Sequence, residues 1–385
     1  MYNEEEKPKR PIRWGMIGGG RGSEIGYAHR TSAMRDDIFE LVAGAFDINP
    51  DACRSFGVAL GLDEKRCYSD YKTLINEESK REDGIEALSI AAPNFLHYES
   101  TKAALEAGLH VICEKPLSFR SDEAKELVEI SRDKNLLLGV SYGYSGFPIV
   151  HQAKSMIKRG VLGRIRIVNM QFAHGFHSAP VNSPGASWRI NPKTSGPSYV
   201  LGDVGIHAFH LGQLLTDLEV NQILCSRQSF IPERAPLEDN ANVLIKYKGG
   251  AIGNLWASSV NAGSMHQQKV RVIGDKASIE WWDEHPNQLR FEIQGEPVQI
   301  LERGMPYLDR EDFGVNQDRI GGGHAEGFFE SWANIYYRYA KGILSIKNNE
   351  KPNLWYPNGQ EGLYGVRFIE ASVNSSNKGE VWVDF

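Results

Sequence analysis

The stretch that decides the fold is Ile12-Arg13-Trp14-Gly15-Met16-Ile17-Gly18-Gly19-Gly20-Arg21-Gly22-Ser23-Glu24-Ile25-Gly26. It begins as a short apolar run, passes through a glycine cluster and leaves as a helix-like segment. That order is typical of a dinucleotide-binding strand, turn and helix, in which glycines let the backbone approach a pyrophosphate at the helix N-terminus. We therefore expect the nucleotide to lie against Gly18, Gly20, Arg21, Gly22, Ser23 and Ile25.

The glycine spacing departs from the usual G-x-G-x-x-G pattern. Gly18 and Gly20 match its first two positions, but Ser23 occupies the third. Gly26 can take over the helix-packing role if the turn is about three residues longer than usual. A glycine-rich turn is often only a turn, so the strand before it, the helix after it and the acidic residue described next carry the cofactor prediction.

That acidic residue is Asp47, which ends a second strand-like run, Phe39 to Asp47. A carboxylate in this place accepts the ribose hydroxyls of NAD and repels the 2′-phosphate of NADP. NAD is the expected cofactor. NADP is less favoured, although Ile48, Asn49 and Arg54 do not exclude it.

Composition limits the class of protein. The 385 residues are 41% hydrophobic and 24% charged, with a formal net charge of −6 and no basic stripe, so nucleic acid is not an expected partner. No apolar run is long enough for a membrane span. The four cysteines are scattered and are expected to be free thiols, which together with the polar N-terminus favours a cytoplasmic location.

The chain divides into three parts: a polar tail (1–11), an α/β domain (12–146) and an α+β domain (147–385). In the first domain strands alternate with helices, which predicts a doubly wound parallel sheet, a Rossmann fold. In the second, hairpins are expected at 241–247 with 251–258 and at 269–273 with 277–282, in a large, mostly antiparallel open sheet. Helices are expected at 121–134 and 325–340, among others.

Four short motifs in order resemble the glucose–fructose oxidoreductase / inositol dehydrogenase (Gfo/Idh/MocA) family. They are Ala92-Pro93-Asn94-x-x-His97, Glu114-Lys115-Pro116, Trp188-Arg189 and Gly202-Asp203-x-Gly205-x-His207. The resemblance implies an NAD(P)-dependent dehydrogenase of sugars, cyclitols or related polyols, assembled as a homo-oligomer (dimer or tetramer) through the C-terminal sheet. It also implies further cofactor contacts from the loops that follow the later strands: Ala92, Pro93, Asn94, His97, Glu114, Lys115 and Tyr142.

By the family pattern the catalytic residues are Lys115, Asp203 and His207. Oxidation of a secondary alcohol needs a base for the hydroxyl proton, and an imidazole suits that role. Asp203 precedes His207 by four residues, so on a helix both side chains share a face and the carboxylate can orient the ring. Lys115 can stabilise developing alkoxide charge. The plainer alternatives are that Asp203 only caps a helix and that Lys115 is a solvated loop lysine.

The loop from His174 to Ser198 supplies further candidates. His174 and His177 lack a Cys or carboxylate partner to complete a metal site, so no metal is expected. The substrate is expected to contact Lys115, Tyr142, His177, Trp188, Arg189, Asp203 and His207. Arg189 and Lys193 would also accommodate an anionic group on a sugar.

Two other functions stay open at this stage. Oxidation at one sugar carbon acidifies the neighbouring C–H, which permits an oxidoreductive glycosidase with tightly held NAD, possibly acting on a sulfonated or carboxylated sugar. A non-catalytic NAD-binding sensor would keep the fold but lose the catalytic residues, and here Lys115, Asp203 and His207 are all present.

Overall fold

The computed structural model describes residues 8–180 and 188–385. Contacts group these residues into two compact units. The first unit comprises the chain up to Gly143 together with Trp332–Leu363, and the second comprises Tyr144–Ser331 and Tyr364–Phe385. The sequence-based division assigned residues 332–363 to the C-terminal domain, whereas the contacts place them with the N-terminal sheet.

The first unit is built on a five-stranded parallel sheet in the order β2-β1-β3-β4-β5. Its strands are β1 (Ile12–Gly18), β2 (Phe39–Ala45), β3 (Ala87–Ala91), β4 (His110–Cys113) and β5 (Leu138–Val140). The predicted doubly wound parallel sheet is confirmed. Because β1 and β3 are neighbours while their connections leave in opposite directions, the carboxyl ends of these two strands form the ligand-binding switch point of such sheets.

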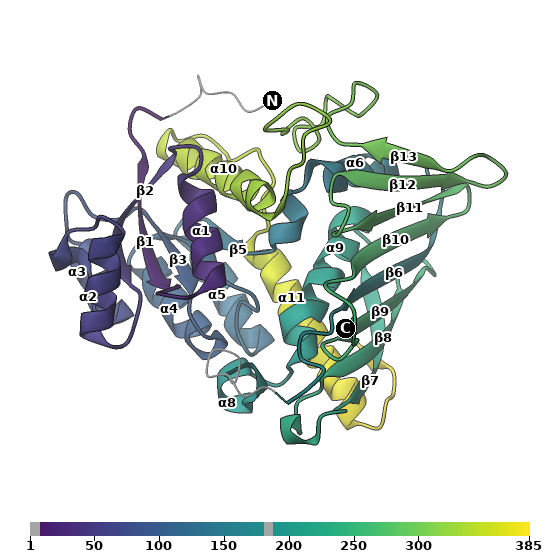
Figure 1. Cartoon of the computed structure of the whole chain (residues 1–385), viewed down its shortest axis with the longest axis horizontal. Coiled ribbons are helices and arrows are strands. Elements are labelled where there is room, and N and C mark those ends of the chain that lie inside the picture. The colour runs from purple at the N-terminus through teal and green to yellow at the C-terminus, as the bar shows by residue number, and fades with distance from the viewer. Residues whose placement is uncertain (1–7, 181–187) are drawn as a thin grey trace. The chain divides into compact units, whose positions relative to one another are not determined.

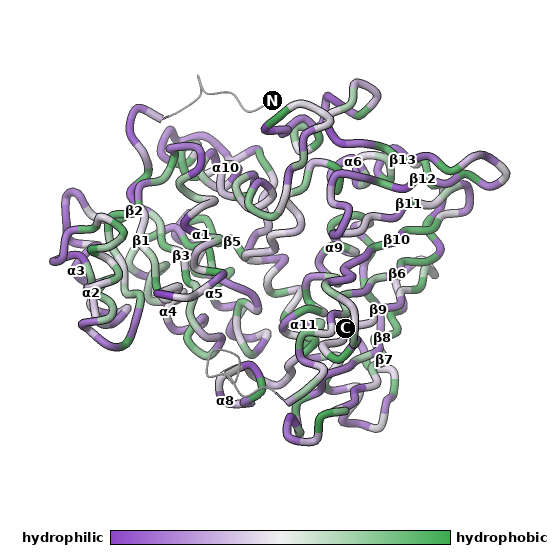
Figure 2. Tube along the Cα trace, in the orientation of Figure 1, coloured by the Kyte–Doolittle hydropathy of each residue, from purple (hydrophilic) through white to green (hydrophobic). Residues whose placement is uncertain are grey.

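Helices cover both faces of this sheet. They are α1 (Glu24–Met34), α2 (Pro50–Ala59), α3 (Tyr71–Glu78), α4 (His97–Glu106) and α5 (Ser121–Asp133). α1 lies on one face together with α10 (Phe328–Lys347), and α4 and α5 lie on the other (Figure 1). The strands are therefore buried on both sides and run hydrophobic along most of their length rather than alternating (Figure 2).

The second unit carries a nine-stranded sheet in the order β13-β12-β11-β10-β6-β9-β8-β7-β14. All its pairings are antiparallel except β6 (Ile165–Ala173) with β9 (Ile252–Ser258). Both predicted hairpins are confirmed, as β8 (Asn240–Tyr247) with β9, and β10 (Gln268–Gly274) with β11 (Ala277–Trp282). The remaining strands are β7 (Val220–Gln228), β12 (Gln288–Ile293), β13 (Gln299–Glu302) and β14 (Val383–Asp384).

One face of this sheet is covered by helices (Figure 1). α6 (Pro148–Lys158) and α9 (Ile206–Thr216) pack on it, and α11 (Gly359–Asn377) packs on α9 through stacked Phe209 and Phe368, whose ring centroids are 4.3 Å apart. α8 (Pro192–Ser195) is a single turn. α10 runs beyond the predicted end at residue 340, and α11 was not predicted. Among the helices of the described ranges, none combines the length and apolar character that crossing a bilayer requires.

Candidate active site

The glycine turn forms a close-fitting cradle after β1. Gly18 has φ +73°, and a Cβ there would lie 2.4 Å from the carbonyl oxygen of Ala91. A Cβ on Gly20 would lie 2.6 Å from the carbonyl oxygen of Phe46. Side chains at either position would therefore collide with neighbouring backbone, so the turn can pack this closely against the ends of β2 and β3 only with glycine at both positions.

Gly26, and not Ser23, plays the part of the third glycine in the G-x-G-x-x-G pattern. A Cβ on Gly26 would lie 2.4 Å from the Cα of Gly19, so α1 can approach the turn only with glycine here. Ser23 instead caps α1, since its side chain accepts a hydrogen bond from Gly26 N at 3.0 Å. Arg30, buried on α1, donates to the Gly19 carbonyl at 2.5 Å and fixes the turn from behind. The sequence analysis did not identify Arg30.

Asp47 lies beyond the end of β2 and is exposed. One of its oxygens accepts a hydrogen bond from the backbone N–H of Asn49 at 2.8 Å. This bond fixes the orientation of the carboxylate. With the cradle, this carboxylate is the group expected to receive ribose hydroxyls, so the residues present fit NAD.

The turn Glu114-Lys115-Pro116 follows β4 at the same edge of the sheet. The Lys115–Pro116 peptide bond is cis. His97 is fully buried and bridges this turn to the loop after β3: its Nδ1 is 2.7 Å from the Pro116 carbonyl and its Nε2 is 2.9 Å from the Ala92 carbonyl. These contacts make His97 a support for two cofactor-side loops. Burial is the largest influence on His97 and lowers its pKa.

Asp203 and His207 lie at a helix junction in the second unit. Leu201–Gly205 forms one π-helical turn that carries Asp203, and α9 then begins at Ile206. Asp203 does not cap α9, because the residue in the capping position is Gly205 and no side chain makes a capping hydrogen bond there. The helix-capping alternative for Asp203 is therefore wrong. π-turns of this kind are frequent at functional sites.

Aromatic rings surround His207. The Tyr144 ring meets it edge-on with centroids 5.1 Å apart, and the Phe172 ring of β6 lies 6.2 Å away. Both rings also contact His266, at 5.9 Å and 4.5 Å. His266 is in turn bonded through Nδ1 to the Asp283 carboxylate. Sequence reasoning missed Tyr144, Phe172 and His266, because no local motif marks them: they lie on a 3₁₀ turn, on β6 and in the loop before β10, and only the tertiary fold brings them together.

The loop histidines join the same group. His177 Nδ1 is hydrogen-bonded to the Tyr199 hydroxyl, and the His174 and His177 rings are 5.7 Å apart. Burial lowers the pKa of both histidines, that of His174 to about 4, while the Asp203 charge acts in the opposite direction. His174 is therefore neutral near pH 7. Arg189 Nε lies 3.8 Å from an Asp203 oxygen.

The other predicted residues lie as follows. Trp188 belongs to a short 3₁₀ turn, Trp188–Ile190. Tyr142 is 1% exposed in the first unit, and burial raises its pKa. Within the described ranges no group of three or more His, Cys, Asp or Glu side chains could hold a metal ion.

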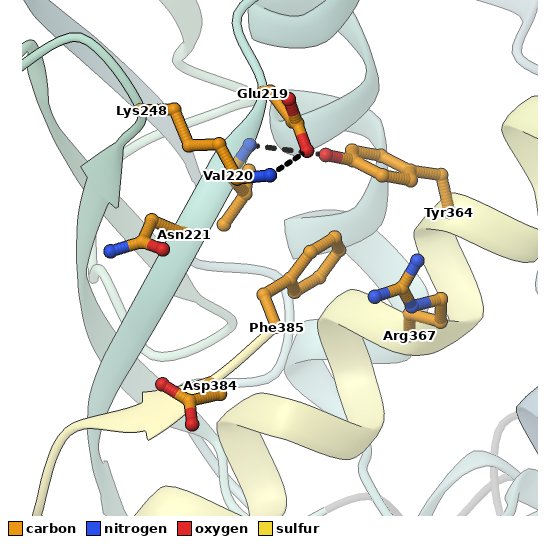
Figure 3. Close-up of a pocket in the computed structure, with 8 residues that line it drawn as sticks. All are labelled: Glu219, Val220, Asn221, Lys248, Tyr364, Arg367, Asp384 and Phe385. Atoms are coloured by element: carbon orange, nitrogen blue, oxygen red, sulfur yellow. Dashed lines mark hydrogen bonds and ion pairs between the residues drawn. The ribbon is translucent and has the colours of Figure 1, made fainter.

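A separate surface pocket of about 280 Å³ lies beyond the C-terminal end of α9, which an 11-residue helix puts roughly 15 Å from His207. Its lining includes Lys248, paired with Glu219, and the C-terminal Phe385 beside Arg367 (Figure 3). The residues named above for cofactor and substrate do not line this pocket.

Comparisons with known proteins cover the whole chain. Residues 12–142 match the NAD-binding Rossmann fold of the GFO_IDH_MocA oxidoreductase family, and residues 154–385 match that family's C-terminal alpha/beta domain. A solved inositol dehydrogenase homolog from Azotobacter vinelandii, in complex with NADH and myo-inositol, is 54% identical with a TM-score of 0.96 over 100% of both chains. The uncharacterized oxidoreductase YfiI of Bacillus subtilis is 49% identical over 100% of both chains. Levoglucosan dehydrogenase of Pseudarthrobacter phenanthrenivorans is 28% identical over 72% of this chain and 75% of the relative.

Proposed function

This chain belongs to the Gfo/Idh/MocA oxidoreductase family, and we propose that it oxidises a secondary ring hydroxyl of an inositol or a related sugar to a ketone. It is an NAD-dependent oxidoreductase with a Rossmann domain. Myo-inositol is the first substrate to test, because a homolog that is 54% identical over its whole length binds it with NADH.

The observation that carries the proposal is the junction at Asp203 and His207. His207 accepts the hydroxyl proton, and the Asp203 carboxylate stabilises the imidazolium that results. Lys115 donates a hydrogen bond to the same substrate oxygen while negative charge develops on it. Bound NAD⁺ would supply the hydride acceptor. Tyr144, part-exposed beside His207, provides an aromatic surface against which a ring can lie, and the buried Phe172 packs behind His207.

The test is turnover of NAD⁺ by the purified protein with a panel of myo-inositol, levoglucosan, D-glucose and aryl glucosides. His207→Asn and Lys115→Met are each expected to lower turnover about 10²–10⁴-fold, and His207→Asn is expected to retain its affinity for NAD⁺. The control is His285→Asn, which changes an exposed histidine of the same unit. Unchanged turnover in His207→Asn would remove the base assignment.

Other outcomes identify the two alternatives. Release of the aryl group without net NADH would indicate an oxidoreductive glycosidase. Tight NAD⁺ binding without turnover of any member of the panel would favour a sensor.

A further inference from the structure

A fully buried histidine in the first unit lies next to the turn that carries Lys115. His29, on α1, has Nε2 3.0 Å from Oε1 of Glu114, and Nδ1 2.5 Å from the hydroxyl of Tyr336 on α10. The other oxygen of Glu114 accepts the backbone N–H of Lys115 at 3.2 Å. His29 is thus separated from Lys115 by one carboxylate.

The hydrogen bonds continue behind His29. The Tyr336 hydroxyl is 2.8 Å from Ser89 Oγ on β3, and Ser89 Oγ is 2.8 Å from Nε1 of Trp14 on β1. All of these side chains are buried. An indole N–H can only donate, so Trp14 must be the donor at one end of this series of hydrogen bonds.

This fixed end sets the direction of the other bonds. Trp14 donates to Ser89, Ser89 to Tyr336, Tyr336 to His29 Nδ1, and His29 Nε2–H to Glu114. In this direction every polar hydrogen of these side chains has an acceptor in the series. In the opposite direction Ser89 would accept two hydrogen bonds, and its own hydroxyl hydrogen would have no acceptor in the series. The arrangement favours a neutral His29 protonated at Nε2 and an ionised Glu114.

The charge on Glu114 agrees with this direction. Burial raises the pKa of Glu114, but the hydrogen bond from His29 and the positive Lys115 act against burial, and its pKa lies below the ordinary value. Ser141 adds a further hydrogen bond. His97 and Tyr336 also face this carboxylate. A fixed negative charge therefore lies beside Lys115.

We propose that His29 is a positioning residue for Lys115 and acts through the Glu114 carboxylate. The buried imidazole holds the carboxylate in one orientation, and the carboxylate holds the Lys115 backbone N–H and balances the charge of its side chain. Since Tyr336 belongs to α10, the arrangement also makes a segment far along the chain part of the support for the catalytic turn. This inference rests on the proposed role of Lys115 in hydride transfer.

The central experiment compares two substitutions that differ in which imidazole nitrogen they replace. The Asn side-chain nitrogen in His29→Asn reaches the place of Nδ1, so Glu114 loses its partner, whereas the Gln nitrogen in His29→Gln reaches the place of Nε2 and still donates. With myo-inositol and NAD⁺, His29→Asn is expected to lower kcat about 10–100-fold, and His29→Gln to restore much of the loss.

A second comparison separates positioning from general loss of stability. In a Lys115→Met background, His29→Asn is expected to cause no further fall in kcat, since its effect acts through Lys115. Ser131→Ala is the stability control, because it removes a buried hydrogen bond to the Leu136 carbonyl in the same unit but outside the series of hydrogen bonds that contains His29. It is expected to lower Tm without lowering kcat.

The results that overturn the inference are distinct from those that overturn the function. Equal effects of His29→Asn in both backgrounds would overturn the positioning role. So would a fall in kcat in Ser131→Ala as large as the fall in His29→Asn at an equal loss of Tm. Unchanged turnover in Lys115→Met would instead remove the proposed role of Lys115, and the inference with it, while absence of turnover of every panel member by the unsubstituted protein would overturn the proposed function. Independently of activity, ¹⁵N-histidine NMR of the whole chain is expected to show His29 protonated at Nε2 alone, and the Nδ1-protonated form would contradict the inference.

Discussion

The Arg189 guanidinium and the Asp203 carboxylate form an ion pair, with Nε and Oδ1 3.8 Å apart and both side chains part-exposed. A pair of this length and exposure contributes less than about 1 kcal/mol to folding. Its effect is therefore expected at the site, where it keeps a cation beside the carboxylate that we propose to assist His207.

Arg189→Met is expected to raise the KM for myo-inositol about 10-fold while Tm stays nearly unchanged, because the guanidinium donates hydrogen bonds to ring hydroxyls. Lys193→Met is the matched control, since Lys193 is an exposed cation on the neighbouring α8. Steady-state kinetics and a thermal melt check both. Equal KM values in the two variants would remove Arg189 from the substrate site.

Asp47 is expected to decide the preference between the two dinucleotides. Asp47→Ser removes a carboxylate that would repel a 2′-phosphate, so the ratio of kcat/KM for NAD⁺ to that for NADP⁺ should fall at least about 10-fold. Asp51→Asn removes a more distant and exposed charge from the start of α2 and should leave the ratio unchanged. An unaltered ratio in Asp47→Ser would show that another group selects the cofactor.

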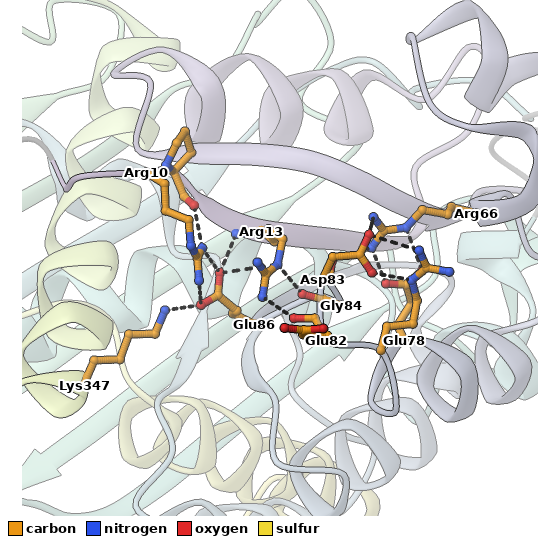
Figure 4. Close-up of polar contacts among 11 residues, drawn as sticks. Arg10, Arg13, Arg66, Glu78, Glu82, Asp83, Gly84, Glu86 and Lys347 are labelled. Atoms are coloured by element: carbon orange, nitrogen blue, oxygen red, sulfur yellow. Dashed lines mark hydrogen bonds and ion pairs between the residues drawn. The ribbon is translucent and has the colours of Figure 1, made fainter.

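Protonation of Glu86 is expected to lower the free energy of unfolding in acid. It lies at the amino edge of the parallel sheet, where Arg10 donates to it at 2.6 and 3.0 Å, the Arg13 backbone N–H donates at 2.9 Å, and Lys347 of α10 pairs with it (Figure 4). Burial raises its pKa, but these hydrogen bonds outweigh burial and lower the pKa from 4.5 to about 2.

A carboxylate whose pKa is depressed in the folded state stabilises the fold above its unfolded pKa and loses that effect as pH falls towards its folded pKa. Glu86→Gln should therefore lower the free energy of unfolding by on the order of 2 kcal/mol at pH 7, and the difference from the unsubstituted protein should shrink between pH 4.5 and about 2. Urea unfolding at several pH values measures this difference in the free energy of unfolding. Asp122→Asn removes a solvent-exposed pair with Arg120 and should have little effect. A difference that is independent of pH would contradict the electrostatic explanation.

The outer face of the nine-stranded sheet is expected to be a contact between copies of the chain. Leu244 and Ile252 are 44% and 48% exposed on adjacent strands, whereas their neighbours Val243 and Ile245 are buried. Leu244→Glu with Ile252→Glu should shift the protein towards a smaller species, because two charges would be buried in an apolar contact. Light scattering after gel filtration measures the mass. An exposed change away from this sheet, Val58→Glu on α2, is the control.

The sequence by itself determined the fold class and the local elements of the cofactor half. The glycine order from Gly18 to Gly26 predicts the cradle because only glycine permits its φ angles and close contacts. Strand-like runs joined by the short turns Lys248-Gly249-Gly250 and Gly274-Asp275-Lys276 predict the hairpins, and Asp203 and His207 stand in one motif. Each of these features depends on residues that are close together in the sequence, so it can be predicted from the sequence alone.

Only the tertiary structure decided what surrounds those residues. His29, Glu114 and Tyr336 are far apart in the chain, and they meet because α1 and α10 pack on the same face of the parallel sheet. Packing of α9 on β6 and β10 likewise brings Phe172, and His266 in the loop before β10, close to His207. No short-range pattern predicts such contacts, since they arise from the burial of separate apolar faces against a common sheet.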